Sequence, residues 1–353
     1  MRDVAKLPRM IRRVLALLFL LVSFGAPATA LETVTVATTR DASNGALFLA
    51  AARGYFKAEG IELAMRAYPS AQAAAEALAG NVTDLGVTAF TAIAFDLAGR
   101  GAIKAISAQA AEKNGYEGNA IVASNVSHTR GLRKFENLAN KSVGLIELAG
   151  QYHYQLGQIA ARKQFGFGSM TLRAIPSVDE IVKAVADNKL DAAILPQMPA
   201  RQMLLAGQAR LVGWYSELDE QQLGAVFASA RTLQTRRGMI EKFLRAYRRA
   251  IADYTVAFLR VDAYHKRIID DKSLKTAAAI ARYLYPGRAG ESVNRAVIDA
   301  TYFVEPQARL AAPDIERQIK WYKDQGLIAR DVEAGAVIDA AFMPPPPPPK
   351  SRR

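Results

Sequence analysis

The sequence predicts an α/β fold with two lobes, each a mainly parallel β-sheet flanked by helices. Three observations support this prediction. Short strand patterns alternate with helical patterns of about ten residues, which is typical of parallel sheets with crossover helices. The alternation starts again after Gly131, as a second unit would. The chain of 353 residues is also longer than a single hydrophobic core usually supports.

The first 30 residues have the features of a secretory signal peptide. Three arginines between positions 9 and 13 precede an apolar run of 11 residues, Val14 to Phe24, and Ala28-Thr29-Ala30 fits a cleavage site. The apolar run is shorter than the roughly 20 residues that a membrane-spanning helix needs. We therefore expect export and cleavage near Leu31, with a retained signal anchor as the alternative.

The absence of cysteine limits the chemistry of this chain. It excludes disulfides, thiolate metal sites and cysteine nucleophiles. It also excludes lipid attachment to an N-terminal cysteine of the mature protein, so a lipoprotein is not expected. An exported protein of this kind is expected to be free in the periplasm of a Gram-negative cell.

The formal net charge is +13, of which the first 30 residues carry +4 and the last four carry +3. The remaining +6 is dispersed among acidic residues, and the densest cluster, Arg245, Arg248 and Arg249, is interpreted as a solvated helix face. No basic stripe alternates with stacking aromatic residues, so the sequence gives no support for nucleic-acid binding. A modest positive field favours anionic solutes.

The first unit contains short strand patterns joined by helical patterns. Ser70 is a suitable N-cap for one helix, and Gly80 with Asn81 is a suitable end for it. The predicted strands span residues 34–38, 61–67, 85–88, 105–108 and 120–124, and the predicted helices span 45–57, 71–79 and 90–98.

The second unit has the same alternation. Its predicted strands span residues 141–146, 172–175, 192–195 and 210–214, and its predicted helices span 151–165, 178–187 and 200–206. A strand over 224–229 is then expected to return to the first lobe. The helices predicted after it span 238–259, 262–270, 273–284, 290–301 and 312–324.

These patterns predict a discontinuous first lobe. We expect residues 31–127 and 222–340 in lobe 1 and residues 128–221 in lobe 2, with crossings near 125–130 and 221–229. Residues 343–353, with six prolines and a basic end, predict an extended polyproline II tail. No repeat of fixed short period is found, and the two units share only a type of organisation.

No motif in the sequence nominates an enzyme, a cofactor or a metal site. The three histidines, His128, His153 and His265, lack the spacing of a metal motif, and there is no G-x-S-x-G elbow or P-loop. Gly166-Phe167-Gly168 follows a predicted helix, whereas a dinucleotide fingerprint follows a strand and opens a helix.

Turns that follow predicted strands offer a binding site instead. In open parallel sheets, ligands bind beyond the carboxyl ends of the strands, and helix N-termini there favour anions. Simple helix capping is the alternative role for Ser43 and Thr88, and Arg40 could instead pair with Asp41. The candidate ligand-binding residues are Arg40, Ser43, Asn44, Thr88, Phe90, Thr91, Gln109, Gln151, Tyr152, His153, Pro196, Gln197 and Met198.

Several segments together resemble the nitrate/sulfonate/taurine type of ABC-transporter solute-binding proteins. This group includes binders of the thiamine pyrimidine precursor. The resemblance covers roughly residues 32–330 and rests on local signatures at 52–61 (ARGYFKAEGI), 77–88 (ALAGNVTDLGVT), 138–144 (LANKSVG), 185–194 (VADNKLDAAI) and 242–248 (KFLRAYR).

The resemblance implies a monomeric protein with a type II-like periplasmic-binding-protein fold that closes on a small solute. Its partners would be the permease and ATPase subunits of an importer in the inner membrane. Family members often carry a Trp-Glu-Pro-like segment where this chain has Pro196-Gln197-Met198-Pro199. This difference argues against a taurine- or nitrate-like mode of binding and favours a larger or aromatic solute.

Two alternatives share the predicted fold. One is a periplasmic sensor subunit that presents the solute to a membrane kinase, and the other is an enzyme of pyrimidine metabolism. A cytosolic regulator's effector domain is disfavoured by the predicted signal peptide and by the lack of a helix-turn-helix module.

Overall fold

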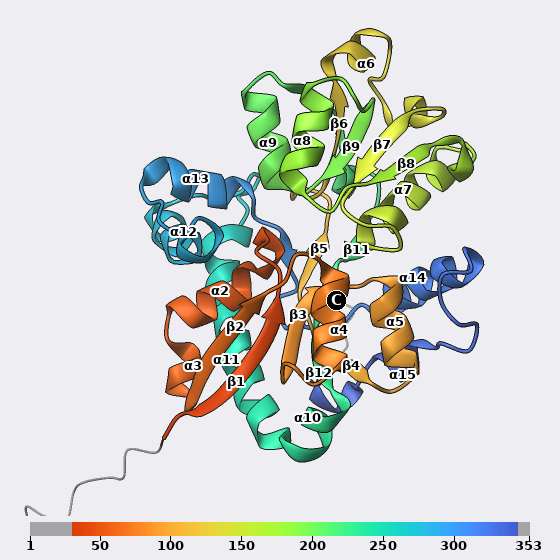
Figure 1. Cartoon of the computed structure of the whole chain (residues 1–353). Coiled ribbons are helices and arrows are strands. Elements are labelled where there is room, and N and C mark those ends of the chain that lie inside the picture. Colours follow the sequence, from red (N-terminus) through yellow and green to blue (C-terminus); the bar gives the residue numbers. More distant parts are fainter. Residues whose placement is uncertain (1–29, 345–353) are drawn as a thin grey trace, which may run out of the picture.

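The computed structural model describes residues 30–344, which form two lobes, each around a five-stranded sheet (Figure 1). The signal peptide and almost all of the proline-rich tail predicted from the sequence lie outside this range. No helix in the described part of the chain has the length and apolar character needed to cross a membrane.

The sheet of lobe 1 has the strand order β2-β1-β3-β12-β4. Its strands are β1 (Glu32–Thr38), β2 (Ile61–Ala67), β3 (Leu85–Ala89), β4 (Ile103–Ala108) and β12 (Gly224–Ser229). β2, β1 and β3 pair in parallel, whereas β12 is antiparallel to both of its neighbours.

The sheet of lobe 2 has the order β10-β6-β9-β7-β8. Its strands are β6 (Ala120–Ser124), β7 (Ser142–Leu145), β8 (Thr171–Ala174), β9 (Ala192–Leu195) and β10 (Ala209–Trp214). Here β6 is the antiparallel strand. Each sheet thus contains one antiparallel strand, and in each case this is the strand that enters from the other lobe. The predicted two-lobed, mainly parallel α/β fold is confirmed.

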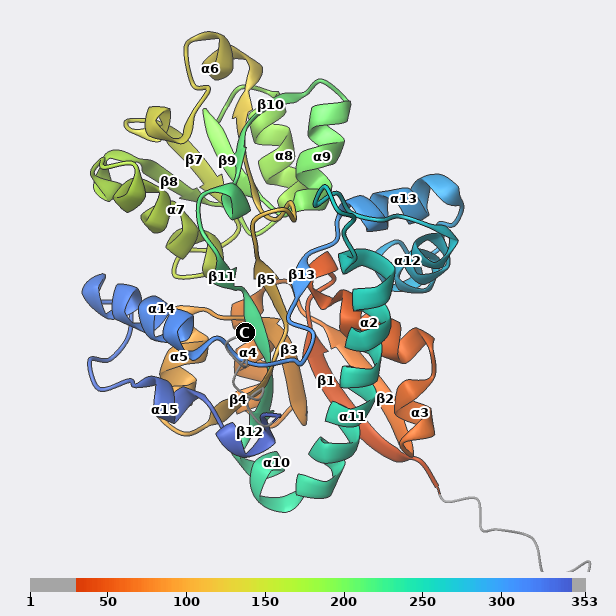
Figure 2. The same cartoon turned by 180° about the vertical axis from the view of Figure 1, so that it is seen from behind.

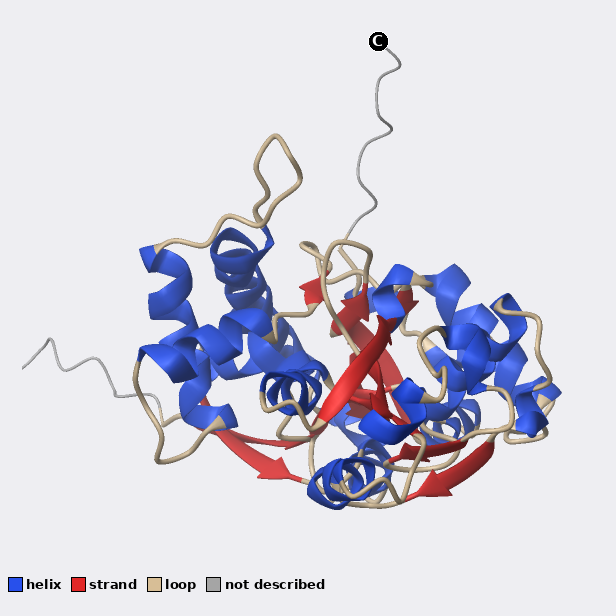
Figure 3. Cartoon of the chain, turned by 90° about the horizontal axis from the view of Figure 1, so that it is seen from above, coloured by secondary structure: helices blue, strands red, loops and turns tan. Residues whose placement is uncertain are grey.

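Helices cover both faces of the sheets (Figure 3). In lobe 1, α2 (Gly45–Ala52), α3 (Tyr55–Ala58) and α11 (Arg237–Tyr254) pack together, and α4 (Ala71–Ala79) packs with α5 (Ala92–Gly99). Lobe 2 carries α6 (Asn125–Thr129), α7 (Gln151–Arg162), α8 (Val178–Ala186) and α9 (Gln197–Leu205). The other helices are α10 (Ala230–Thr235), α12 (Asp271–Leu284), α13 (Glu291–Asp299), α14 (Ala312–Asp324) and α15 (Ala334–Val337). Short helical turns are η2 (Ala42–Asn44), η3 (Phe135–Leu138), η4 (Phe167–Ser169), η5 (Tyr215–Glu217), η6 (Thr255–Leu259) and η7 (Ala340–Phe342).

A third, small sheet joins the lobes. It has the order β11-β5-β13, with β5 (Ala110–Glu112), β11 (Gln221–Gln222) and β13 (Phe303–Val304), and lies between the two large sheets (Figure 2). The first crossing therefore runs through β5, earlier than the predicted 125–130. Strand 120–124 has the predicted bounds but pairs in the sheet of lobe 2, because alternation along the chain does not say which sheet a strand joins.

Two predicted helices differ from the structure. Residues 262–270 form no helix, since the Asp262 carboxylate accepts hydrogen bonds from the backbone of Tyr264 and Lys266 and turns the chain back on itself. The helix predicted over 45–57 is divided into α2 and α3 at Gly54, whose φ of 69° is a left-handed conformation that glycine adopts without strain.

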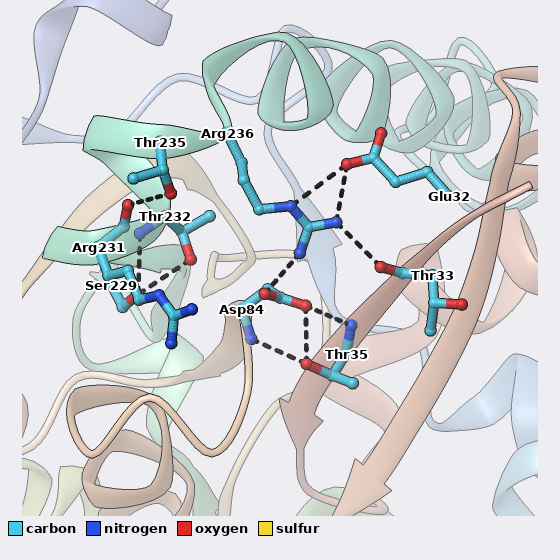
Figure 4. Close-up of polar contacts among 9 residues, drawn as sticks. All are labelled: Glu32, Thr33, Thr35, Asp84, Ser229, Arg231, Thr232, Thr235 and Arg236. Atoms are coloured by element: carbon cyan, nitrogen blue, oxygen red, sulfur yellow. Dashed lines mark hydrogen bonds and ion pairs between the residues drawn. The ribbon is translucent and has the colours of Figure 1, made fainter.

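Arg236 ties the return segment of lobe 1 to the start of β1 (Figure 4). Its guanidinium donates to the Glu32 carboxylate at 2.8 Å, to the Asp84 carboxylate at 2.6 Å and to the carbonyl of Thr33 at 2.9 Å. Burial alone would raise the pKa of Asp84, but hydrogen bonds from Thr35 and Arg236 hold this pKa below its usual range. The cluster is therefore a structural brace on the side of the sheet away from the carboxyl ends of β1 and β3.

The part of this brace made by Asp84 and Thr35 has a counterpart in lobe 2. Asp84 accepts from the backbone and hydroxyl of Thr35, and Asp191 accepts in the same way from Ser142. Both pairs are separated by 49 positions.

Ser142 and Asp191 each lie 107 positions after their counterparts, Thr35 and Asp84. The same offset of 107 positions separates Tyr68-Pro69-Ser70 from Ile175-Pro176-Ser177. The two lobes therefore share equivalent positions as well as equivalent strand orders, a closer relation than the sequence patterns predict.

Candidate functional site

A cleft of about 240 Å³ lies between the lobes, at the carboxyl ends of their parallel strands. Lobe 1 contributes the turns that follow β1 and β2, and lobe 2 contributes the turns that follow β7, β8 and β9. The cleft is lined by Thr39, Arg40, Asp41, Ser43, Tyr68, Pro69, Ser70, Ala71, Ile146, Glu147, Gln151, Tyr152, Val178 and Pro196.

The wall from lobe 1 is built around Asp41. Its carboxylate caps the helical turn η2 by accepting from the backbone N–H of Ser43 at 2.8 Å. Burial raises the pKa of Asp41, although the hydrogen bonds from Ser43 oppose this rise. Arg40, next to it, is exposed to solvent. The polar turn therefore presents a partly buried carboxyl group to the cleft and an exposed guanidinium to solvent.

The wall from lobe 2 is built around Glu147, in the loop that leads into α7. Burial raises the pKa of Glu147, hydrogen bonds from Ser70 and from the backbone of Gln72 oppose the rise, and the charge of Glu76 adds to it. Ser70 and Gln72 belong to lobe 1, where Ser70 is the N-cap of α4. The Glu147 carboxylate thus reaches across the cleft to a helix N-terminus, which favours negative charge.

Two further hydrogen bonds join the lobes beside Glu147. The Nε2 atom of Gln72 donates to the carbonyl of Leu148 at 2.9 Å, and the backbone N–H of Ala92 donates to the carbonyl of Ala149 at 2.9 Å. We call this set of contacts, made by Ser70, Gln72 and Ala92 with residues 147–149, the interlobe latch. These contacts join the two walls of the cleft.

Buried polar groups lie beneath the cleft, in the hinge. Glu112 of β5 is 1% exposed, and its Oε1 atom accepts from the backbone N–H of Asn119 at 2.8 Å. Burial raises the pKa of Glu112 to about 8, against the hydrogen bonds from Asn119 and Gln155 that lower it. The Tyr302 hydroxyl donates to Asn119 at 2.8 Å. This network connects the first crossing to α7 and to the C-terminal segment.

Five of the candidate residues predicted from the sequence line the cleft. Arg40 and Ser43 come from lobe 1, and Gln151, Tyr152 and Pro196 come from lobe 2. Tyr152 is 6% exposed, and the Oε1 atom of Gln151 is buried without a hydrogen-bond partner among the described residues.

Four candidates lie behind the lobe 1 wall. Asn44 and Gln109 are buried and bonded to each other, with 2.6 Å between the Gln109 Nε2 and Asn44 Oδ1 atoms. Thr88 is fully buried, and the Thr91 hydroxyl caps α5 by accepting from the backbone of Ala94. These residues support the turns of the cleft.

The other four candidates pack in the interior or at its margin. The Phe90 ring stacks on Phe95 in the core and is fully buried. The His153 ring packs edge-on against Trp321, and burial lowers the pKa of His153. Gln197 is buried and donates to Glu117 at 3.2 Å. Met198 packs against the largest hydrophobic cluster.

The sequence-based candidates omitted most of the second turn of each lobe. Tyr68, Pro69 and Ser70 line the cleft from lobe 1, and Val178 lines it from lobe 2. The matching Pro-Ser pairs at 69–70 and 176–177 would have indicated both turns. The carboxyls of Asp41 and Glu147 were also omitted.

The lining of the cleft offers carboxyl, hydroxyl and amide groups, one guanidinium and two tyrosines. Within residues 30–344, no cluster of three or more acidic or histidine side chains is placed to hold a metal ion.

Solved structures with the same fold include binding proteins. The alkanesulfonate-binding protein SsuA from Xanthomonas axonopodis pv. citri, bound to MOPS, matches with a TM-score of 0.67 and 16% identity, covering 88% of this chain and 99% of SsuA. The periplasmic nitrate-binding protein NrtA from Synechocystis PCC 6803 matches with a TM-score of 0.64 and 12% identity, covering 88% and 87% of the two chains.

The same fold is also found in a mutant of DszB in complex with biphenyl-2-sulfinic acid. This structure matches with a TM-score of 0.58 and 14% identity, covering 88% of this chain and 97% of that one. At such low identities, the three similarities establish the fold alone.

Sequence comparison identifies the family. No curated protein gives a significant match. The family model described as NMT1/THI5 like matches residues 42–257, which is more than half of the chain and includes all of lobe 2 and the first two hinge strands. Together with the fold of SsuA and NrtA, this match confirms the resemblance to nitrate- and sulfonate-type binding proteins. The chain belongs to the NMT1/THI5-like family.

Proposed function

We propose that this protein is the periplasmic solute-binding component of an ABC importer. It would capture a small organic or anionic solute between its lobes and deliver it to a membrane permease. The observation that carries the proposal is the cleft itself, which is lined from both lobes and lies above a hinge of three short strands. Two-lobed proteins of this kind close on a ligand by bending at such a hinge.

The candidate solutes are sulfonates, nitrate, aromatic carboxylates and pyrimidine-like compounds. SsuA and NrtA, which have the same fold, are sulfonate- and nitrate-binding proteins. In the importer, the permease would recognise the closed form, whose population rises when solute binds.

A thermal-shift screen of the chain from residue 31 onward tests this proposal. The protein should first be unfolded and refolded to remove any solute carried through purification. A ligand that binds only the folded state stabilises it by about 2.7 kcal/mol at a hundredfold excess over its dissociation constant. A saturable shift with one class of solute is expected. No shift with any of these classes would count against this range of solutes.

An enzyme on the same fold is the second candidate. DszB, crystallised as a mutant with biphenyl-2-sulfinic acid bound, has this fold. A solute that binds and is recovered chemically unchanged after prolonged incubation would support the receptor, whereas its conversion would support the enzyme. A sensor subunit would bind solute as the receptor does, and would be distinguished by capture of a membrane kinase rather than a permease.

A further inference from the structure

The charge balance of the cleft narrows the class of solute that the proposed receptor would take. Its lining contains two carboxyl groups, Asp41 and Glu147, and one cationic group, Arg40. The two carboxyls are partly buried, and burial raises the pKa of each, whereas Arg40 is exposed and its charge is screened by water and salt. The interior of the cleft is therefore acidic, although the chain as a whole is basic.

Neither carboxyl is neutralised by a cation. Hydrogen bonds to Asp41 come from Ser43, and those to Glu147 come from Ser70 and Gln72, all of them uncharged groups. The nearby Glu76 adds repulsion at Glu147. Within the described part of the chain, no ion pair includes either carboxyl. Burial makes the charged form of each carboxyl less favourable, so each would gain from a cationic partner.

Several of the helix N-termini around the cleft, which usually attract anions, already have acceptors from the chain itself. Asp41 caps η2, and the Ala149 carbonyl accepts from the first N–H of α5. Glu147 accepts from the first turn of α4 and also packs against Gly150, the N-cap of α7. A Cβ added at Gly150 would lie 2.9 Å from the Glu147 Oε1 atom, so this carboxylate blocks the start of α7 as well.

Two other features of the lining would also favour a cationic ligand that carries N–H groups. The Oε1 atom of Gln151 is a buried acceptor without a partner in residues 30–344, and a ligand N–H would satisfy it. Tyr68 and Tyr152 contribute aromatic rings from the two lobes, and the faces of such rings attract cations.

From these contacts we infer that the cleft selects solutes with a cationic, N–H-rich head group, such as an amidine, guanidine or amine, over sulfonates and nitrate. The head group would lie between Asp41 and Glu147, and any anionic part of the solute would lie near Arg40. This inference rests on the proposed receptor function and names its substrate class.

Calorimetric titration with a matched pair of probes, benzamidine and benzenesulfonate, tests the inference on the refolded chain from residue 31 onward. The two probes share a phenyl ring and differ in their charged group. Benzamidine is expected to bind at least roughly tenfold more tightly, since one charge-assisted hydrogen bond accounts for that factor. Preference for benzenesulfonate would overturn the inference and leave the receptor function intact. Binding of neither probe would count against both.

Substitutions of the two carboxyl residues test whether benzamidine binds between them. Asp41→Asn and Glu147→Gln keep the shape of the side chains, and each should weaken benzamidine binding at least roughly tenfold. Glu316→Gln, at an exposed position of α14, is the control and should leave the affinity within about twofold. An anion receptor predicts the opposite pattern, in which Arg40→Gln weakens benzenesulfonate and the carboxyl variants strengthen it.

Discussion

The fold strongly changes the ionisation of Glu112. It is buried in hinge strand β5, and no hydrogen bond from the described residues reaches its Oε2 atom. Burial raises its pKa from 4.5 to about 8, so the carboxyl group is protonated in the folded protein at neutral pH. The unfolded chain would have released this proton, which links stability to pH.

The raised pKa of Glu112 predicts that stability falls as pH increases. Between pH 4.5 and 8 the folded state binds one proton more than the unfolded state at this residue, so its contribution is complete below 4.5 and is lost as pH rises through 8. Glu112→Gln should remove most of this slope while keeping the hydrogen bond from Asn119. Urea unfolding at several pH values measures how the free energy of unfolding depends on pH, with Glu316→Gln as the control. An unchanged slope in Glu112→Gln would show that other groups cause the dependence.

Arg236 should be a major determinant of the stability of lobe 1. It bonds to two carboxylates and a carbonyl, and its side chain is 27% exposed. Arg236→Met would leave Glu32 and Asp84 without their cation and should lower the free energy of unfolding by about 2 kcal/mol.

The matched control for Arg236 is Arg295→Met. Arg295 bonds to Glu291 one helical turn away, with both side chains more than 60% exposed, so its loss should change the free energy of unfolding by less than about 0.5 kcal/mol. Equal effects of the two substitutions in denaturant unfolding would contradict the role of the brace.

At the scale of elements, the contact between α7 and α14 depends on a glycine. A Cβ at Gly157 would lie 2.4 Å from the Trp321 ring, which packs edge-on against Tyr154 and is not a flexible group. Gly157→Ala should therefore destabilise the protein by about 1–3 kcal/mol through overpacking, although alanine is the better helix former.

Gly238, in α11, provides the comparison for Gly157. A Cβ there meets no atom within 4 Å, so Gly238→Ala should be neutral or stabilising by up to about 1 kcal/mol. Thermal unfolding of the two variants should therefore show shifts of opposite sign. A stabilising effect of Gly157→Ala would mean that α14 moves away from α7 without cost.

Elements with clear end signals could be predicted from the sequence. The bounds of α4 follow from the Ser70 cap and from Gly80, and those of α14 agree with the expected 312–324. The hinge strands β5, β11 and β13 could not be predicted, since segments of two or three residues have no periodicity. For the same reason the sequence patterns predict the first crossing later in the chain than β5, where it lies.

The sequence predicts which turns form the site, but it predicts only some of the directions in which their side chains point. Strands of parallel sheets are buried on both faces and lack alternation, so the pattern around β3 does not show that Phe90 and Thr91 point into the core. The role of Glu147 depends on a contact with Ser70 and Gln72, which lie more than 70 positions away. No local pattern contains that information.

At the scale of the whole molecule, equivalent residues in the two lobes allow the contribution of a contact to lobe closure to be measured separately from its contribution to stability. Ser70 and Ser177 occupy equivalent positions in the two lobes, and both cap helices of nine residues by accepting a backbone N–H in the first turn. Only Ser70 also bonds to Glu147 across the cleft. The two serines thus form a natural pair for testing the interlobe latch.

We expect Ser70→Ala, but not Ser177→Ala, to shift the protein toward an open form. Each substitution removes one cap and should lower stability by about 1 kcal/mol. The loss of a hydrogen bond to the Glu147 carboxyl should lower the closed-to-open ratio roughly tenfold in Ser70→Ala alone. Because the chain has no cysteine, dyes on Lys57→Cys in lobe 1 and Leu205→Cys in lobe 2 can report the distance between lobes by energy transfer. Equal energy transfer in both variants, with equal losses of stability, would show that Ser70 only caps its helix and that closure depends on other contacts.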